Sequence, residues 1–266
     1  MTQTSPQSND EKKSQVQDYF SRTAENYVTS SSHSKGNDLK RLIEIGEWNA
    51  QQHALDIATG GGHTALAVAP HVAQITVTDL TPRMLEKARE FLLSQGVANA
   101  QFQVADAEQL PFENATFDRA TCRIAPHHFP NIARAVQEVA RVLKPGGLFL
   151  LIDNTVPSDP ELDTFGNTVE KWRDPSHGRS CTVEEWLTFF KQASLSVEHT
   201  EMFPKTFNYD DWTARSQLPP QEKAKLEHFI LGSNDHIKSS FKVAVRADGH
   251  LESFSIESVL LKGRKP

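Results

Sequence analysis

Cysteine and long apolar runs are both scarce in this sequence of 266 residues. The two cysteines, Cys122 and Cys181, are too few for a disulfide framework, and no C-x-x-C spacing indicates a zinc knuckle or an iron–sulfur cluster. No uninterrupted apolar run is longer than the five residues 148–152, whereas a bilayer-spanning helix needs about 20. The sequence therefore predicts neither a disulfide-rich scaffold nor a membrane-spanning protein.

An excess of basic residues is also missing. Lys and Arg number 28 against 34 Asp and Glu, which gives a net charge of −6, so no nucleic acid is expected as a partner. Residues 1–15 are polar and contain no apolar segment of the kind found in secretory signals. We interpret residues 1–15 as a disordered tail and expect a cytoplasmic location.

The first half of the chain alternates short apolar segments with helical patterns. Residues 16–48 show two helical stretches separated by a loop at 29–36, and this region is predicted to form a helical lid. After it, five strands are predicted at residues 54–58, 74–78, 101–104, 117–122 and 148–152, with helices after the second strand and at 132–143. Strands that alternate with helices are typical of a parallel sheet covered on both faces.

The second half is less regular. The sequence TVEE at 182–185 is a capping-box pattern that predicts the start of a helix. Residues 195–202 and 254–261 are predicted strands, and a polar helical segment at 210–232 is interrupted by Pro219 and Pro220. Insertions at about 155–182 and 205–245 are expected to form a cap. We therefore predict a doubly wound, seven-stranded, mostly parallel α/β domain over residues 49–266.

The most informative segment is LDIATGGGHTAL at residues 55–66, a strand that enters a glycine turn and then a helix. Consecutive glycines permit positive φ and a close approach of backbone to ligand, and the turn after the first strand is where doubly wound sheets bind ligands. Gly60, Gly62 and Ala65 match the dinucleotide pattern G-x-G-x-x-G/A, and Asp79 follows Gly62 by 17 positions. An NAD-dependent oxidoreductase is therefore one interpretation. S-adenosylmethionine (SAM) is the other ligand that suits this turn.

Four motifs in order resemble the class I SAM-dependent methyltransferases, in the branch of the ubiquinone/menaquinone C-methyltransferases. They are LDIATGGG at 55–62, VTDLTPRML at 77–85, VADAEQLPF at 104–112 with ATFD at 115–118, and VLKPGG at 142–147. The resemblance extends from about Leu55 to Asp153. It favours the methyltransferase over the dehydrogenase, which would give no role to Asp106, Ala107 or the PGG turn.

The resemblance implies that SAM is the cofactor, that S-adenosylhomocysteine is its product, and which residues contact the cofactor. Asp79 would accept hydrogen bonds from both ribose hydroxyls, a task suited to a carboxylate. Asp106 and the Ala107 amide would contact the adenine, with Leu80 and Met84 on the two faces of its ring. The remaining implied contacts come from Tyr27 in the lid, from Asp56, Ala58, Thr59, Gly60 and Gly62 of the loop, and from Arg123. Ala58 replaces the glycine more usual in the family, and we expect it to have an ordinary φ.

Candidate catalytic and substrate residues follow the fourth and fifth strands. His127 and His128 lie in the segment CRIAPHHFP at 122–130, and an imidazole suits general-base work near neutral pH. Arg123, His177 and Arg179, with His33 from the lid, are the candidate substrate contacts. The spacing of the histidines does not indicate a metal site.

The predicted function is SAM-dependent methylation of a small-molecule acceptor by a monomer or homodimer, with neither a nucleic acid nor a membrane as partner. A non-catalytic SAM-binding protein is a second alternative beside the NAD-dependent oxidoreductase.

Overall fold

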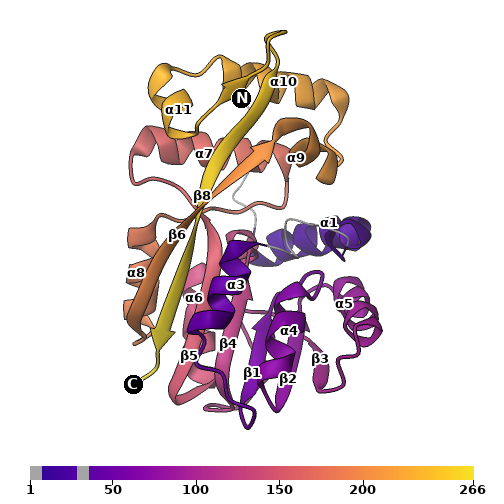
Figure 1. Cartoon of the computed structure of the whole chain (residues 1–266), viewed down its shortest axis with the longest axis vertical. Coiled ribbons are helices and arrows are strands. Elements are labelled where there is room, and N and C mark those ends of the chain that lie inside the picture. The colour runs from indigo at the N-terminus through magenta and orange to yellow at the C-terminus, as the bar shows by residue number, and fades with distance from the viewer. Residues whose placement is uncertain (1–7, 29–35) are drawn as a thin grey trace.

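One sheet organises the molecule (Figure 1). The structure is a computed structural model that describes residues 8–28 and 36–266, with side chains described from 8 to 22 and from 36 onward. The predicted loop at 29–36 therefore lies almost wholly outside the described residues. The strand order is β3-β2-β1-β4-β5-β8-β6, and a short β7 pairs with β8. The strands are β1 (His53–Ile57), β2 (Gln74–Asp79), β3 (Ala100–Val104), β4 (Phe117–Arg123), β5 (Leu143–Thr155), β6 (Ser196–Asn208), β7 (Ala244–Val245) and β8 (Leu251–Arg264).

Strands β1 to β5 pair with one another in parallel, and β8 is antiparallel to both β5 and β6. The order runs outward from β1 in both directions, which confirms the predicted doubly wound, mostly parallel sheet. The seven strands of this order match the predicted number, and the two-residue β7 is an addition beside β8. In such a sheet the crevice outside the carboxyl ends of the strands, near the point where the order reverses, is where ligands bind.

Helices cover both faces of the sheet because its strands are apolar on both faces. In β5, Phe149 and Leu151 belong to one apolar cluster, and Leu150 and Ile152 belong to the cluster on the other face. Helices α6 (Ile132–Val142) and α8 (Val183–Gln192) cover the first face; α3 (Asn37–Ile45), α4 (His63–Val68), the 3-10 turn η1 (Ala69–His71) and α5 (Pro82–Ser94) cover the second. The predicted capping box is present, because Thr182 accepts from the Glu185 amide while Glu185 accepts from the Thr182 amide.

The N-terminal helix α1 begins earlier than predicted, at Asn9, and extends to Val28. The tail prediction is therefore wrong for residues 9–15, and residues 1–7 lie outside the described part of the chain. Ser8 and Glu11 form reciprocal hydrogen bonds at the helix start, 2.9 Å and 3.2 Å long. This S-x-x-E capping box satisfies the free amides of the first turn, and it was visible in the sequence.

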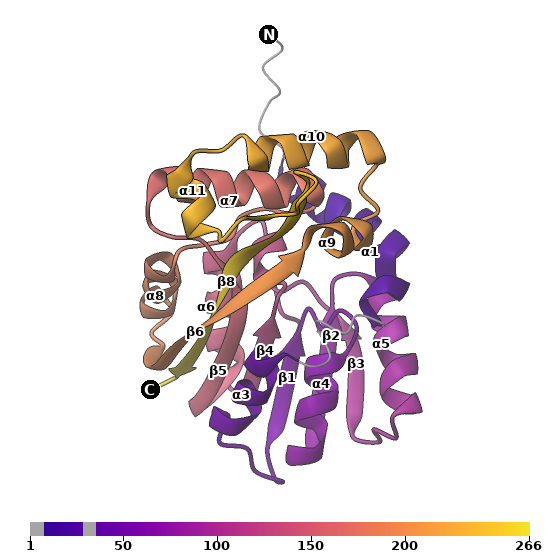
Figure 2. The same ribbon diagram turned by 45° about the horizontal axis from the view of Figure 1, so that its top comes forward.

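A group of helices stands above the carboxyl ends of the strands, carried by the extended β6 and β8 (Figures 1 and 2). It contains α7 (Pro160–Arg173), α9 (Tyr209–Arg215), α10 (Pro220–Leu231) and α11 (Asp235–Ser240). These helices share an apolar cluster that includes Phe165, Trp212 and Phe254. Helix α7 was not predicted, although Asp159 and Pro160 give a standard start signal and Asp159 caps the Glu161 amide at 2.9 Å.

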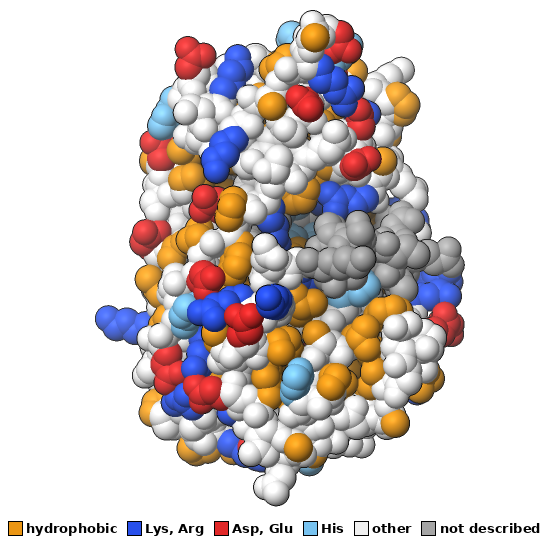
Figure 3. Space-filling model, in the orientation of Figure 1, with side chains coloured by type: hydrophobic (Ala, Val, Ile, Leu, Met, Phe, Trp, Pro, Cys, Tyr) orange, Lys and Arg blue, Asp and Glu red, His pale blue; other side chains and the backbone are white. Residues whose placement is uncertain are grey.

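Acidic and basic side chains are intermixed on the face shown in Figure 3. Several form ion pairs between distant elements, such as Arg264 of β8 with Glu47 and Glu198. None of the described helices is long and apolar enough to span a membrane.

Candidate functional site

The buried carboxylate of Asp56, near the end of β1, holds the glycine turn between β1 and α4 in place. This carboxylate is 1 % exposed and accepts hydrogen bonds from the hydroxyls of Thr59 and Thr121, each at 2.6 Å. Burial raises the pKa of Asp56 to about 6, despite these hydrogen bonds. Asp56 therefore orients the loop, and it is not among the residues that line the cavity described below.

Ala58, Gly60 and Gly62 all have positive φ, of 51°, 55° and 84°. The expectation of an ordinary φ at Ala58 is therefore wrong. The reason is the turn itself: Ala58 is the first residue after β1, and in this conformation the Thr59 amide donates to the Thr78 carbonyl at 2.9 Å. Gly62 packs against α5, where a Cβ would lie 3.4 Å from that of Ala88, and Gly62 does not line the cavity.

Ala58→Gly should stabilise the protein. A non-glycine residue in the left-handed region is disfavoured by about 1–2 kcal/mol, and part of the gain is offset by the greater entropy of glycine in the unfolded chain. We expect a net gain of roughly 0.5–1 kcal/mol and a rise in melting temperature of about 1–3 °C, measured by calorimetry. Ala65→Gly inside α4 is the matched control and should lower the melting temperature; a fall for Ala58→Gly as well would contradict the strain assigned here.

Asp79, at the carboxyl end of β2, faces the glycine turn. Its two carboxylate oxygens accept from the Gly60 amide at 3.1 Å and from the Thr81 amide at 2.8 Å. Burial raises the pKa of this carboxyl to about 6, while the amide hydrogen bonds work in the opposite direction. Each oxygen has a second lone pair, so Asp79 can accept further hydrogen bonds from a ligand.

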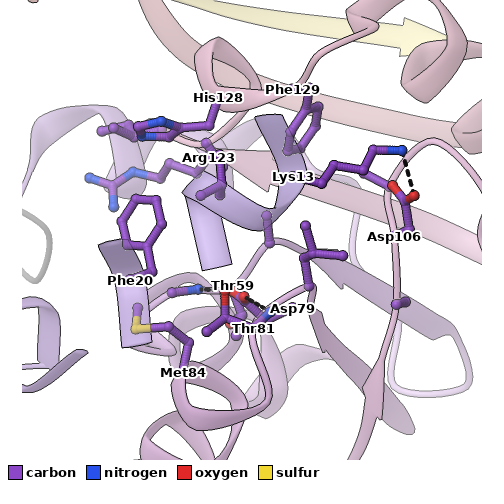
Figure 4. Close-up of a pocket in the computed structure, with 18 of the residues that line it drawn as sticks. Lys13, Phe20, Thr59, Asp79, Thr81, Met84, Asp106, Arg123, His128 and Phe129 are labelled. Atoms are coloured by element: carbon purple, nitrogen blue, oxygen red, sulfur yellow. Dashed lines mark hydrogen bonds and ion pairs between the residues drawn. The ribbon is translucent and has the colours of Figure 1, made fainter. Parts of the chain in front are cut away.

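Asp106, after β3, is held by a lysine from α1. Lys13 Nζ lies 2.7 Å from Asp106 Oδ2 and 2.7 Å from Glu108 Oε2 (Figure 4). Gln17, one turn further along α1, donates to the Leu80 carbonyl at 2.9 Å. Helix α1 is therefore attached to the ends of two strands by polar contacts.

A cavity lies between the carboxyl ends of the strands and α1. It contains about 970 Å³ of empty space, part of it open to solvent. Figure 4 shows Thr59, Asp79 and Met84 on one side of this space, with Arg123 and His128 across from them. The predicted site residues that line it are Ala58, Thr59, Gly60, Asp79, Leu80, Met84, Asp106, Ala107, Arg123 and His128.

Arg123 ends β4 and is buried in a charged cluster. Its guanidinium donates to both oxygens of Asp38 in α3, at 3.0 Å and 3.1 Å. Lys205 of β6 lies 3.5 Å from the same carboxylate. Burial opposes ionisation of Asp38, but Arg123 and Lys205 together lower its pKa. The ion pair is thus a buried, bidentate one, and it fixes Arg123 at the edge of the cavity.

His128 lies in the 3-10 turn η2 (Pro126–His128). Its Nδ1 is 3.1 Å from the Ser176 carbonyl and 3.2 Å from the Ser176 hydroxyl, and that hydroxyl donates to Asp174 at 2.5 Å. A carbonyl can only accept, so the neutral ring carries its proton on Nδ1, which leaves Nε2 with a free lone pair. Burial, followed by the neighbouring His127, lowers the pKa of His128 far below its ordinary value. Phe20 of α1 packs edge-on against the ring.

His127 does not line the cavity. It is 5 % exposed, and its Nδ1 lies 2.6 Å from Asp153 Oδ1 at the end of β5. Burial disfavours its charge, but Asp153 outweighs burial and raises the pKa of His127. The structure therefore distinguishes the two candidate bases. His128 lines the cavity and can reach a ligand there, whereas His127 is buried beside Asp153 and does not line the cavity.

The two other predicted substrate residues of the second half lie elsewhere. His177 is buried, with Nε2 3.1 Å from Asn167 Oδ1, and Arg179 forms ion pairs with Asp163 and Glu185, both at 2.9 Å. Both residues line a second cavity beyond His128. His33 and the side chain of Tyr27 lie outside the described part of the structure. Among the described residues, no group of His, Cys, Asp or Glu is arranged to hold a metal ion.

The sequence analysis predicted a lid from residue 16 onward but did not identify the residues of α1 that line the cavity. Lys13, Val16 and Phe20 line it, and they follow one another at the spacing of a helix face. The capping box at Ser8 and Glu11 would have placed the helix start correctly and so revealed this face.

Comparison with known proteins matches residues 55–151 to the family described as "Methyltransferase domain". The uncharacterized methyltransferase YcgJ of Bacillus subtilis is 37 % identical over 246 residues, which cover 92 % of this chain and 97 % of YcgJ. The chain belongs to the class I SAM-dependent methyltransferases. The crystal structure of YcgJ superimposes with a TM-score of 0.83 over 86 % of this methyltransferase and 97 % of that chain.

Two further relatives support the family and its fold. A solved structure of a Bacillus halodurans C-125 protein that is assigned as a methyltransferase is 42 % identical, with a TM-score of 0.85 over 87 % of this methyltransferase and 100 % of that chain. The ubiquinone/menaquinone biosynthesis C-methyltransferase UbiE of Brucella anthropi is 32 % identical over 186 residues, 67 % of this methyltransferase and 66 % of UbiE. The resemblance found in the sequence motifs is therefore confirmed.

Acid should destabilise this methyltransferase through His128. The folded state keeps the ring neutral because its pKa is lowered, whereas the unfolded chain takes up a proton near pH 6.5. The stability that His128 contributes is thus fully present above about pH 6.5 and is lost as the pH falls, by up to about 1.4 kcal/mol per pH unit. The melting temperature should decrease less between pH 7 and pH 5 for His128→Gln than for the natural chain. Equal decreases would show that the pKa of His128 is not lowered by folding.

Proposed function

We propose that this methyltransferase transfers the methyl group of SAM to a small-molecule acceptor and that His128 accepts a hydrogen bond from the group to be methylated. The observation that carries the proposal is the arrangement of one cavity, with the glycine turn and Asp79 on one side and His128 and Arg123 on the other. A cofactor held by the first set would present its reactive end toward the second.

The residues around the cavity suit SAM. Asp79 has free lone pairs for the ribose hydroxyls, and Gly60 leaves room beside Met84, whose Cε would lie 3.8 Å from an added Cβ. Met84 and Leu80 are apolar and can enclose an adenine ring, and Asp106 offers an acceptor for its amine. When bound, SAM supplies an activated methyl group on a sulfonium centre.

The protein's own contribution is alignment, exclusion of water and a place for a proton. Positioning alone can supply up to about 7–11 kcal/mol of the barrier. Helix α1 covers the cavity, and Phe20 packs against His128, so α1 can act as the lid predicted from the sequence. A base with a lowered pKa is sufficient for a hydroxyl acceptor, because the oxonium that forms as the oxygen gains a methyl group is strongly acidic.

Calorimetric titration of the full chain with S-adenosylhomocysteine, and separately with NADH, tests the cofactor. We expect micromolar binding of the first and none of the second. The reverse result would favour the oxidoreductase alternative that the G-x-G-x-x-A match allows. Tight binding of S-adenosylhomocysteine without methyl transfer to any member of a broad acceptor panel would favour a non-catalytic SAM-binding protein.

A further inference from the structure

A second cavity lies on the other side of the loop that carries His128. It contains about 980 Å³ of empty space, part of it open to solvent. Its walls come from α1, from the start of α6, from the segment between α7 and α8, and from α8 itself. Apolar side chains contribute much of the lining, among them Phe129, Ile132, Cys181 and Phe189.

The two cavities are both bordered by the loop that carries His128 and by helix α1. His128, Phe129 and Pro130 line both of them. In α1, Lys12 lines the second cavity and its neighbour Lys13 lines the first. A molecule held in the second cavity therefore lies against the same imidazole that borders the cofactor cavity.

The second cavity carries an excess of positive charge, although the whole chain has a net charge of −6. Lys12, Lys171 and Arg179 line it together with one carboxylate, Glu185, and that carboxylate is paired with Arg179. Lys12 is exposed in the first turns of α1. The cations that remain for a ligand are thus Lys12 and Lys171.

Lys171 is prepared to bind an anion. Its Nζ donates to the carbonyls of Pro175 and His177 at 2.7 Å and 2.6 Å, and an ammonium has three N–H groups. Burial, with a contribution from nearby Lys12, lowers the pKa of Lys171, while Asp174 acts in the opposite direction. A bound anion would offset the repulsion between the two lysines and use the third donor.

We propose that the second cavity binds the methyl acceptor, and that the acceptor has an apolar body with an anionic group, a carboxylate or a phosphate, placed between Lys12 and Lys171. The reacting end of the acceptor then extends past His128 toward the cofactor cavity. The assignment of this molecule as the acceptor rests on the proposed methyl transfer; the binding of an amphipathic anion in the second cavity does not.

The test uses the full chain with 13C-labelled histidine, alone and saturated with S-adenosylhomocysteine, followed by NMR. Phenylacetate, phenyl phosphate and the neutral 2-phenylethanol are titrated separately. We expect one or both anions to shift the ring signals of His128 and His177, identified from His128→Gln and His177→Gln, at concentrations at least tenfold below those needed for the alcohol. The anion that binds more tightly shows whether the anionic group of the acceptor is a carboxylate or a phosphate.

Lys12→Glu should weaken the binding of the anion about tenfold or more, since a charge-assisted hydrogen bond is removed and a repulsive charge is added. Lys191→Glu, on α8 outside both cavities, is the matched control and should leave the binding of the anion unchanged. Lys171→Met provides a second variant, with its melting temperature recorded because Lys171 also holds the segment after α7.

Equal affinity for the alcohol and the anions, absence of shifts at His177, or no effect of Lys12→Glu would overturn the proposed anion site. Binding of the anion without any binding of S-adenosylhomocysteine would instead overturn the proposed methyl transfer and leave the anion site standing. Because the titration is run with and without S-adenosylhomocysteine, the two failures are distinguishable.

Discussion

Asp79→Ala should weaken the binding of S-adenosylhomocysteine by about 1.5–3 kcal/mol, a factor of roughly ten to a hundred or more in Kd. The carboxylate lies between the glycine turn and the start of α5, and it accepts hydrogen bonds from the amides of Gly60 and Thr81. Its loss removes the acceptor for two ribose hydroxyls and also frees the loop. Isothermal calorimetry at pH 8, above the raised pKa of about 6, measures the effect on the ionised form.

Asp118→Ala is the control for Asp79→Ala. Asp118 is a half-buried aspartate of the sheet, but it lies near the start of β4, where it accepts a hydrogen bond from the His53 amide and pairs with Lys144. It does not line the cofactor cavity, so its removal should affect stability and leave Kd within about twofold. Equal Kd values for Asp79→Ala and the natural chain would show that the ribose site is misplaced.

His128→Gln should lower kcat by about a hundredfold while Kd for S-adenosylhomocysteine changes little. General-base groups contribute about 10²–10⁴ to rate, and the lowered pKa of His128 places it at the weak end of that range. Glutamine retains a polar side chain of similar size and a donor for the Ser176 carbonyl. The measurement is release of S-adenosylhomocysteine with an acceptor found by screening, over a pH profile that also reports the titrating group.

His127→Gln should act differently, because His127 is paired with Asp153 and lies outside the cavity. Removal of one partner leaves a buried carboxylate without its cation, which typically costs about 3–5 kcal/mol. We expect a fall in melting temperature that exceeds that of His128→Gln.

If His128→Gln retains full turnover with an acceptor that must lose a proton, alignment alone accounts for catalysis.

The local patterns of the sequence determined the fold and the cofactor half of the cavity. Strand β1, the turn at residues 58–62 and helix α4 follow one another directly, so their geometry depends on neighbours in the chain. The same holds for Asp79 after β2 and Asp106 after β3. Because parallel strands end at the same edge of the sheet, the order of the motifs was sufficient to predict that these residues meet. The binding roles of these residues stay predictions.

Only the tertiary structure decided how charges and buried side chains are partnered. Lys13 reaches Asp106 across 93 positions, Arg123 reaches Asp38 across 85, and His127 reaches Asp153 across 26. No local spacing encodes these pairs, because each depends on where helices and strands from separate parts of the chain are packed. The separation of His127 from His128, and the second cavity with its two lysines, follow from that packing. The sequence by itself thus determined the succession of strands and helices in the first half of the chain and the glycine turn, because these are local. The tertiary structure decided which histidine lines the cavity, since that depends on long-range contacts with Asp153 and Ser176.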